Sequence, residues 1–400
     1  MPNRKGSGFQ SLFYCNTRVS QCPEDQSPKD QILPNPTTDI PSVTDIVIIG
    51  GGIAGLSAAA RLSHHASVTL LEGEHSLGYH ASSRSAAAFL EDYGNCVVRS
   101  LNSASAAYLH RENGGVLSAR GMLLVAKAQD KDRFEHEHQE FGLDPISVAE
   151  ARDKIPILNP KTVKYAGFRE DIYDIDTDLL LQNFRQEAQT NAAEIRTKAR
   201  VTGLSYDNKR WTITTSTGVY HATILVNAAG AWADHLAQMA GLNPLGVTPY
   251  RRSMARIPAP AALDVSHWPF MDEVGEAWYA KPDAGQLIVS PCEEHATHPH
   301  DAWADDIVLA EGLARYQQMV TAPVTRITAN WAGLRSFAPD RALVIGHARQ
   351  HPAFFWLVGQ GGYGFQTCVA ASQLTADLIT GRPSELKPQT VNALSPNRFP

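Results

Sequence analysis

Hydrophobic and polar positions form their clearest pattern between residues 45 and 72, DIVIIGGGIAGLSAAARLSHHASVTLLE. Four consecutive β-branched residues, Ile46 to Ile49, predict a short buried strand. The small residues that follow position 53 predict a helix that packs closely, and Val68 to Leu71 predict a second strand. The segment is therefore typical of a strand, a turn, a helix and a further strand.

The turn before this helix is rich in glycine. Gly50, Gly52 and Gly55 match G-x-G-x-x-G, and Glu72 ends the second strand at the distance of about 20 residues that the motif requires. Free N–H groups at the helix N-terminus suit a diphosphate, and the carboxylate suits a ribose hydroxyl pair. Three glycines at this spacing also occur in ordinary turns, but here every required neighbour is present, which favours dinucleotide binding. Glu72 does not distinguish FAD from NAD.

A second cofactor-facing segment is expected after a β-meander at residues 199 to 226. The meander ends in NAAGAW, residues 227 to 232, where Gly230 and its small neighbours present bare backbone. Such backbone is required where a chain passes close to a cofactor.

A second glycine-rich turn follows the buried strand predicted at residues 354 to 358. It contains Gly361, Gly362 and Gly364 and leads into another helix of small residues. The N-terminus of this helix is suited to stabilising negative charge on a reduced ring system.

A serine-rich stretch lies between these two turns, with Ser82 and Ser85 ahead of the run Ala86 to Ala88. We expect a turn that leads into a small-residue helix. Its hydroxyl and N–H groups could face a flat polar ligand, or the serines could simply cap a surface helix, and the residues alone favour neither.

Composition is that of an ordinary soluble globular protein of two to three domains, with 43% hydrophobic and 19% charged residues in 400. The net charge of −6 argues against nucleic acid as the main partner. No apolar run approaches the roughly 18 residues of a transmembrane segment. Five cysteines without a C-x-x-C pair fit a reducing compartment, and we expect a cytoplasmic protein.

Residues 1 to 42 are rich in proline and lack amphipathic periodicity, so we expect a disordered N-terminal extension. An organellar presequence remains open. No metal site is expected: the cluster His295, His298 and His300 has the irregular spacing and loop composition that argue against one.

Several longer motifs occur in order along the chain. They are GYHASSRSAA at 78 to 87, VNAAGAW at 226 to 232, YAKPDAG at 279 to 285, WAGLRSF at 331 to 337, QGGYGFQT at 360 to 367 and LSPNR at 394 to 398. Together they resemble the D-amino-acid oxidase (DAO) family of FAD-dependent oxidoreductases, and within it the bacterial FAD-dependent D-arginine dehydrogenases, over roughly residues 43 to 400.

The resemblance implies an α/β fold with two interleaved domains. A Rossmann-like FAD-binding domain would comprise residues 43–120, 178–236 and 331–400. An antiparallel-sheet substrate domain would comprise residues 121–177 and 237–330.

It also implies FAD that is bound non-covalently, because no cysteine for a covalent flavin can be placed in the SFAPD segment at 336 to 340. The residues that would hold FAD are Gly50, Gly52, Ile53, Ala54, Gly55, Glu72, Ser82, Ser85, Ala86, Ala87, Val201, Gly230, Gly361, Gly362, Tyr363 and Gly364.

For a small-molecule amino acid substrate, the resemblance implies a carboxylate clamp of Arg252 and Arg335. Tyr279 and Tyr363 would donate hydrogen bonds, and Tyr93 would form a lid. The chemistry agrees, because arginine stays protonated and its planar fork binds a carboxylate through two hydrogen bonds.

Two positions depart from the D-arginine dehydrogenase pattern. Ala88 stands where a histidine is expected, and Gly121 where a glutamate that would pair with a cationic side chain is expected. The acidic pair Glu91 and Asp92, beside the lid residue Tyr93, offers a replacement for part of that negative charge. We therefore expect the substrate to be a D-amino acid, or a related amino or imino acid, with a larger or less cationic side chain.

The expected reaction is oxidative deamination of a D-amino acid by hydride transfer from Cα to flavin N5, in a dehydrogenase rather than an oxidase. An N-alkyl amino acid or 2-hydroxy acid oxidoreductase, and a non-catalytic flavin-binding protein, are the alternatives. The electron acceptor, whether a quinone, a carrier or O2, is left open by the sequence.

Overall fold

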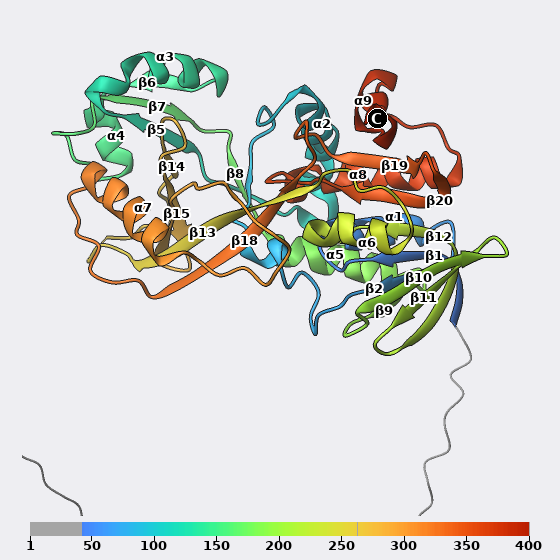
Figure 1. Ribbon diagram of the computed structural model, residues 1–400. Helices are drawn as coiled ribbons and strands as arrows, with labels where there is room; N and C mark the ends of the chain where they lie inside the picture. The colour runs from blue at the N-terminus through green and yellow to red at the C-terminus, as the bar shows by residue number, and fades with distance from the viewer. Residues whose placement is uncertain (1–41, 262, 400) are drawn as a thin grey trace, which may run out of the picture. The chain divides into compact units, whose positions relative to one another are not determined.

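A computed structural model describes residues 42–261 and 263–399 of the chain (Figure 1). The extension predicted over residues 1 to 42 lies outside the described residues, apart from Ser42 at the start of the first strand. No helix in the described part of the chain is long and apolar enough to cross a membrane.

The first sheet is built around β1, which pairs in parallel with β2 on one side and β12 on the other. The sheet order is β10-β11-β12-β1-β2-β9, and β20, which carries β19, also pairs with β12. Its strands are β1 (Ser42–Ile49), β2 (Val68–Leu71), β9 (Glu194–Arg196), β10 (Val201–Asp207), β11 (Arg210–Thr215), β12 (Gly218–Asn227), β19 (Val344–Ala348) and β20 (His351–Val358). The predicted parallel sheet and the antiparallel meander are both confirmed.

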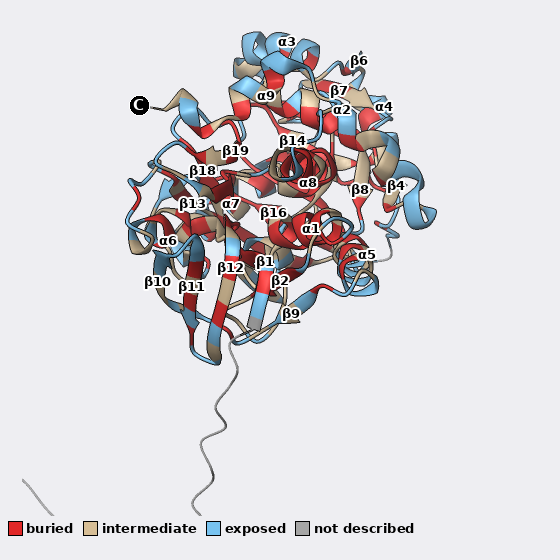
Figure 2. Ribbon diagram, turned by 90° about the vertical axis from the view of Figure 1, so that its right-hand side faces the viewer, coloured by how far each residue is buried: buried red, intermediate tan, exposed pale blue. Residues whose placement is uncertain are grey.

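Helices cover one face of this sheet, as the buried core in Figure 2 shows. They are α1 (Ile53–Leu62), α2 (Cys96–Arg111), α5 (Thr177–Thr190) and α8 (Gly364–Thr380). Ile46 and Ile48 of β1 pack in this helical core, whereas Val47 and Ile49 pack in the core that contains α6 (Ala233–Met239). The β-branched run at 46 to 49 is thus buried on both faces, as a central parallel strand requires.

The second sheet is mostly antiparallel, with the order β17-β13-β16-β15-β14-β5-β7-β6 and with β18 on β13. Its strands are β5 (Met122–Ala126), β6 (Asp144–Ile146), β7 (Tyr165–Arg169), β13 (Thr248–Pro258), β14 (Phe270–Glu273), β15 (Tyr279–Asp283), β16 (Gln286–Ser290), β17 (His295–Ala296) and β18 (Ala329–Phe337). In Figure 1 this sheet lies to the left with α3 (Lys131–Glu140), α4 (Val148–Lys154) and α7 (Asp306–Met319). The predicted mixed α/β architecture is therefore confirmed.

Side chains alternate between the two faces of the second sheet. Trp278, Ala280 and Val289 pack in the core that contains Tyr316 of α7 and Ala151 of α4. The residues between them, including Tyr279, face the opposite side. That opposite side carries the site described below.

A third, three-stranded sheet joins β3 (Ala88–Phe89), β8 (Tyr173–Ile175) and β4 (Leu117–Ala119). The helix predicted from Ala86 onward is wrong. A 3₁₀ turn at Ala81–Arg84 precedes Ala87, whose φ of 45° is left-handed, and Ala88 pairs with Asp174 of β8. Long-range strand pairing here overrides the helical preference of alanine.

The described residues form one compact unit by their contacts, and the two predicted domains with their boundaries stay a prediction. β18, most of which falls in the segment 331–400 predicted for the FAD-binding domain, pairs with β13 along nine positions in the second sheet. The remaining helix, α9 (Pro388–Leu394), follows α8 near the end of the chain.

Candidate active site

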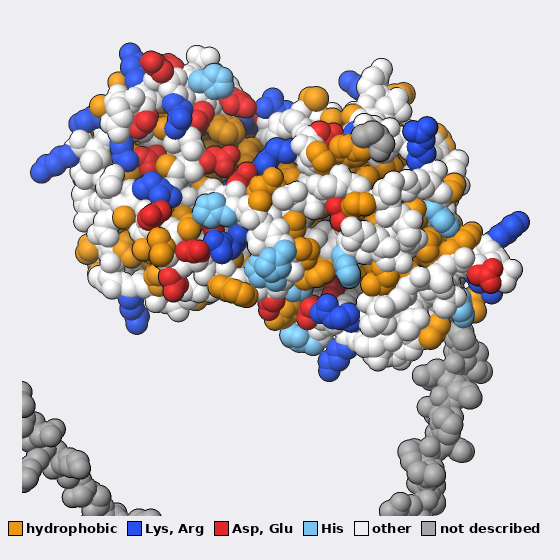
Figure 3. All heavy atoms as spheres, in the orientation of Figure 1, with side chains coloured by type: hydrophobic (Ala, Val, Ile, Leu, Met, Phe, Trp, Pro, Cys, Tyr) orange, Lys and Arg blue, Asp and Glu red, His pale blue; other side chains and the backbone are white. Residues whose placement is uncertain are grey.

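One cavity of about 1180 Å³ is lined by residues of both large sheets. Every site residue predicted from the sequence lines it, except Gly55. The molecular surface is hollowed below α3, where acidic and basic side chains lie around hydrophobic ones (Figure 3). The structure therefore brings together segments that are far apart in the sequence, while what each of them binds stays a prediction.

The glycine-rich turn is shaped by contacts that no side chain would permit. Gly50 has a φ of 113°, and a Cβ atom there would collide with the carbonyl of Ala228. A Cβ on Gly55 would collide with the carbonyl of Gly50, which explains why Gly55 packs beneath the turn and does not line the cavity. The turn therefore leaves open backbone at the N-terminus of α1, where a diphosphate is favoured.

Glu72 and Ser82 hold this turn in place. The Glu72 carboxylate accepts hydrogen bonds from the N–H groups of Gly51 at 2.7 Å and Glu74 at 2.8 Å. Ser82 Oγ accepts from the N–H of Ile53 at 3.0 Å. A carboxylate has about four acceptor positions, so Glu72 can still accept from the two hydroxyls of a ribose.

The segment from Ser85 to Ala87 is fixed from the opposite sheet. Lys281 of β15 is buried, and its Nζ donates to the carbonyl of Ala86 at 2.8 Å and to Oδ1 of Asp174 at 2.6 Å. Lys281 and Asp174 were not predicted as site residues, although Lys281 lies within the YAKPDAG motif. They support the backbone on which the predicted flavin contacts depend.

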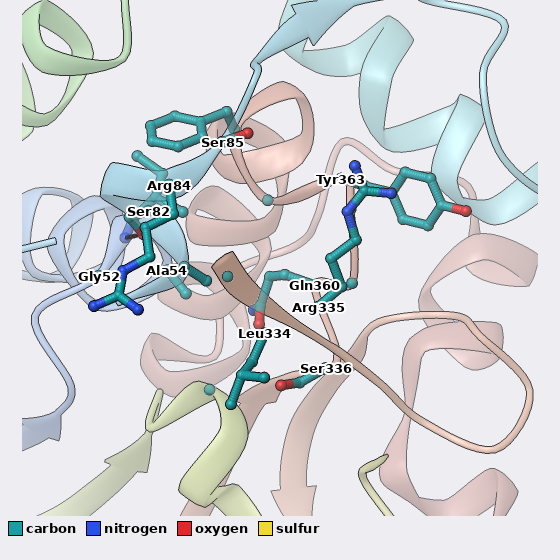
Figure 4. A pocket seen from close by; sticks show the side chains of 18 of the residues that line it. Gly52, Ala54, Ser82, Arg84, Ser85, Leu334, Arg335, Ser336, Gln360 and Tyr363 are labelled. Carbon is teal, nitrogen blue, oxygen red and sulfur yellow. Dashed lines mark hydrogen bonds between the residues drawn. The ribbon is translucent and has the colours of Figure 1, made fainter. Parts of the chain in front are cut away.

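Gly361 and Gly362 come close to residues of β18. Gly361 has a φ of 51°, and a Cβ there would collide with the Phe337 ring. A Cβ on Gly362 would lie 3.3 Å from the guanidinium carbon of Arg335. In Figure 4, Arg335 and Tyr363 lie at one end of the pocket, and Gly52, Ala54 and Ser82 lie apart from them on the other side.

Among the residues predicted to bind the substrate, Arg252 is the most deeply buried, with 3% of its surface exposed. Its Nε donates to the carbonyl of Glu293 at 3.0 Å. Its Nη2 is buried without a hydrogen-bond partner among the described residues, although carboxylates of Glu294 and Glu276 lie 3.5 and 3.7 Å away. A buried guanidinium with an unpaired donor at a cavity is arranged to bind an anion.

Register places the second arginine beside the first. β13 and β18 are antiparallel, with Arg252 opposite Gly333 and Arg335 opposite Tyr250. Positions 250 and 252 share one face, so both arginines project from the same side of neighbouring strands. Arg251, the neighbour that could be confused with Arg252, faces the other side and pairs with Asp305 at 3.0 Å.

Three tyrosines surround the arginines. Tyr279 is 5% exposed, and its hydroxyl donates to the sulfur of Met254 at 3.3 Å. The rings of Tyr93 and Tyr363 meet edge to face at 5.5 Å. Burial raises the pKa of all three phenols above the usual value, so they are hydrogen-bond donors at neutral pH.

The two departures from the D-arginine dehydrogenase pattern have different structural contexts. Ala88 lines the cavity from β3. Gly121 has a φ of 70°, and a Cβ there would lie 3.0 Å from the Phe168 ring. A glutamate at position 121 would therefore be strained and crowded, so that position is fixed by the backbone.

A family model for FAD-dependent oxidoreductases, DAO, matches residues 45–378. The chain belongs to this family. FAD is accordingly its cofactor, and the glycine turns and open α1 N-terminus described above fit that group. The predicted family, the FAD cofactor and the enzyme class of oxidoreductase are thereby confirmed, whereas the finer likeness to D-arginine dehydrogenases is not.

Known members of the DAO family resemble the chain at low identity. Glycine oxidase of Pseudomonas putida is 27% identical over 247 residues, which is 61% of this chain and 65% of that protein. The structure of glycine oxidase from Geobacillus kaustophilus has a TM-score of 0.76 and 20% identity, and covers 90% of this chain and 100% of that one. The structure of dithionite-reduced L-α-glycerophosphate oxidase from Mycoplasma pneumoniae with FAD bound has a TM-score of 0.76 and 20% identity. It covers 87% of this chain and 97% of that one.

Several cavity residues were missed by the sequence reasoning. They include Met254 on β13, and Phe270 and Asp272 on β14, two strands of the second sheet. The sequences of these strands carry no recognisable motif, and only the register of the sheet brings the three residues to the cavity. No group of three or more possible metal ligands is found within residues 42–261 and 263–399.

Proposed function

We propose that this DAO-family protein oxidises a D-amino acid to its imino acid, which then takes up water and yields a 2-oxo acid and ammonia. The observation that carries the proposal is the buried Arg252, whose unpaired Nη2 faces a cavity next to Arg335. Two guanidinium forks on one face of a sheet form a site for one carboxylate.

The residues of this chain would bind and orient the substrate. Arg252 and Arg335 would hold the carboxylate. The Tyr279 hydroxyl would donate to it, since in the free protein that hydroxyl donates to the Met254 sulfur, which is a weak acceptor. Tyr93 and Tyr363 would cover the site and exclude water. When bound, FAD supplies the two-electron acceptor for the Cα hydrogen, which leaves as hydride.

No side chain is assigned as a base. A substrate whose amine binds in the neutral form provides its own electron pair as the Cα–H bond breaks. Positioning the Cα–H bond then supplies much of the reduction in barrier. The preference for the D series rests on the resemblance to D-arginine dehydrogenases.

The direct test is anaerobic mixing of the FAD-loaded protein with D- and L-amino acids, sarcosine, proline and 2-hydroxy acids. Reduction of the flavin is followed as loss of its absorbance at roughly 450 nm. We expect reduction by D-amino acids. Reduction by N-alkyl amino acids or 2-hydroxy acids alone would favour the first alternative, and bound flavin that no compound reduces would favour the non-catalytic alternative.

Two further properties can be read from the same preparation. Admitting air after reduction separates an oxidase from a dehydrogenase, which is the class we favour from the resemblance. Denaturation and removal of the protein should leave all FAD in solution if the flavin is non-covalent. Flavin that stays with the protein would point to Cys96 or Cys292, the two cysteines that line the cavity.

A further inference from the structure

The second sheet presents a carboxylate to the cavity at some distance from the two arginines. Asp272 of β14 pairs in register with Tyr279 of β15, and Tyr279 with Ser290 of β16. Paired residues of neighbouring strands project from the same face. Asp272 therefore faces the same side as Tyr279, and it lines the cavity together with Phe270.

No cation lies within ion-pairing distance of Asp272 in the described part of the chain, and Arg252 acts on its carboxyl group only from farther away. Its Oδ1 atom is buried and lacks a hydrogen-bond partner there. It does not form an ion pair, unlike other acids of this sheet such as Glu273, which pairs with Lys127 at 3.1 Å. An unpaired buried carboxyl group costs stability and is retained where a ligand satisfies it.

Two further carboxylates line the same part of the cavity. Glu276 lies in the turn between β14 and β15, and Glu137 lies on α3. Both oxygens of Glu137 accept from the N–H of Gly275, at 3.0 Å each, so α3 is tied to this turn. Asp272, Glu276 and Glu137 therefore make the cavity acidic around the turn between β14 and β15, and the Glu276 carboxylate also lies 3.7 Å from Nη2 of Arg252.

We propose that Asp272 is a specificity-determining residue that binds a cationic group on the substrate side chain. The inference rests on the proposed function, and it assigns the substrate class: an amino acid whose side chain ends in an ammonium or guanidinium group. Glu276 and Glu137 add negative potential at the same end.

Strand spacing indicates that the cation lies beyond Cα. Arg252 and Asp272 are on β13 and β14, which are separated by β16 and β15. Three steps of about 4.8 Å put the two backbones about 14 Å apart. A carboxylate held by Arg252 therefore leaves room for several side-chain carbons before Asp272 is reached.

This inference reverses the hypothesis from the sequence that the substrate is less cationic. That hypothesis depended on the missing glutamate at position 121. Gly121 is fixed by its backbone, and its carbonyl accepts from the N–H of Phe270 at 3.0 Å, two residues before Asp272. The acidic residue that we assign to this role is Asp272, which lies not at position 121 but on β14, the strand that pairs with β5.

The test separates the distal cation from the oxidation reaction. 5-Aminopentanoate has a carboxylate and a distal ammonium but no α-amino group, and pentanoate lacks the ammonium. Their dissociation constants for the FAD-loaded protein are measured by titration calorimetry. We expect 5-aminopentanoate to bind about tenfold or more tightly than pentanoate.

Two variants locate the effect. Asp272→Asn is nearly isosteric and should abolish the preference for 5-aminopentanoate. Asp144→Asn removes an exposed acid of the same sheet that does not line the cavity, and it should retain the preference. The flavin spectrum and the melting temperature of both variants show whether they fold.

Kinetics then complete the comparison. D-Ornithine and D-lysine should exceed D-norvaline and D-norleucine in kcat/KM in the parent protein, and Asp272→Asn should remove the difference. If D-amino acids reduce the flavin with no such preference, the inference about Asp272 is wrong and the proposed function stands. If no amino acid reduces the flavin but 5-aminopentanoate binds through Asp272, the inference stands and the proposed function is wrong.

Discussion

Arg252 offers the sharpest single test of the proposed substrate site. In the Arg252→Met variant, a carboxylate bound at the cavity loses one of its two guanidinium partners. Truncating one partner of a buried, hydrogen-bonded charge pair costs about 2 to 5 kcal/mol. Arg252 is 3% exposed, so solvent cannot replace it, but Arg335 remains. We therefore expect the lower part of that range, a loss of about 30- to 300-fold in kcat/KM.

Folding should change little in this variant. Nη2 of Arg252 has no hydrogen-bond partner in the described structure, so the variant loses the Nε bond to Glu293 and two longer ion-pair contacts, with Glu294 and Glu276. Removing a buried charge also relieves its desolvation cost. The FAD content and the melting temperature should therefore stay close to those of the parent protein.

The adjacent arginine provides a matched control. Arg251 faces the opposite side of β13, pairs with Asp305 and does not line the cavity. Arg251→Met should change kcat/KM by no more than about threefold. Rate constants for flavin reduction and substrate dissociation constants come from anaerobic stopped-flow experiments. Equal activity of Arg252→Met and the parent would refute the carboxylate clamp.

Three other substitutions test different parts of the site. Tyr279→Phe should lower kcat/KM by about 10- to 100-fold with little effect on stability, because the hydroxyl donates to the weakly accepting Met254 sulfur in the free protein. Unchanged kinetics would exclude Tyr279 from substrate binding. Gly50→Ala should yield protein with little FAD, because the added Cβ atom collides with the carbonyl of Ala228. The FAD content is measured as the ratio of flavin absorbance at roughly 450 nm to protein absorbance at roughly 280 nm. Lys281→Met should lower stability by about 3 kcal/mol in denaturant titrations, because Asp174 loses a buried partner. Asp174 also pairs with Arg120 at 2.7 Å, and a stability equal to that of the parent would show that Arg120 alone satisfies Asp174.

The nucleotide-binding part of the fold was predictable because its signals are local. β1, the glycine turn and α1 follow one another within about 20 residues, and each is fixed by neighbours in the sequence. The β2 strand was predicted with the observed ends, Val68 and Leu71. The helix predicted after Ala86 failed because its backbone is determined by pairing with β8, roughly 85 residues away.

Candidate substrate-binding residues could be predicted only where a sequence motif or the family resemblance indicated them. Arg335 and Tyr279 belong to recognisable motifs, whereas Asp272 sits in the four-residue strand β14. Nothing in FMDE distinguishes its aspartate from its glutamate. The strand register determines which of the two acidic side chains faces the cavity. Glu273 faces away and pairs with Lys127, whereas Asp272 faces the cavity. Such assignments require the order and alignment of strands that are far apart in sequence.

The charge state of Asp272 determines how selective the site can be. Burial raises its pKa well above the usual range, and Glu276 and Glu137 raise it further, while Arg252 opposes them. The empty site can therefore hold a neutral carboxyl group, so a neutral substrate would be accepted with a modest loss. A cation favours the ionised form, and its binding should release a proton.

Proton release gives the last prediction. A group with a raised pKa is ionised only as pH rises toward that pKa, so the affinity for 5-aminopentanoate should increase with pH over this interval, while that for pentanoate should not. Calorimetry in buffers of different ionisation enthalpy measures the released protons directly. Asp272→Asn should abolish both the release and the pH dependence. Binding of 5-aminopentanoate to the parent without proton release would mean that Asp272 is already ionised, and selectivity would then depend on excluding neutral side chains.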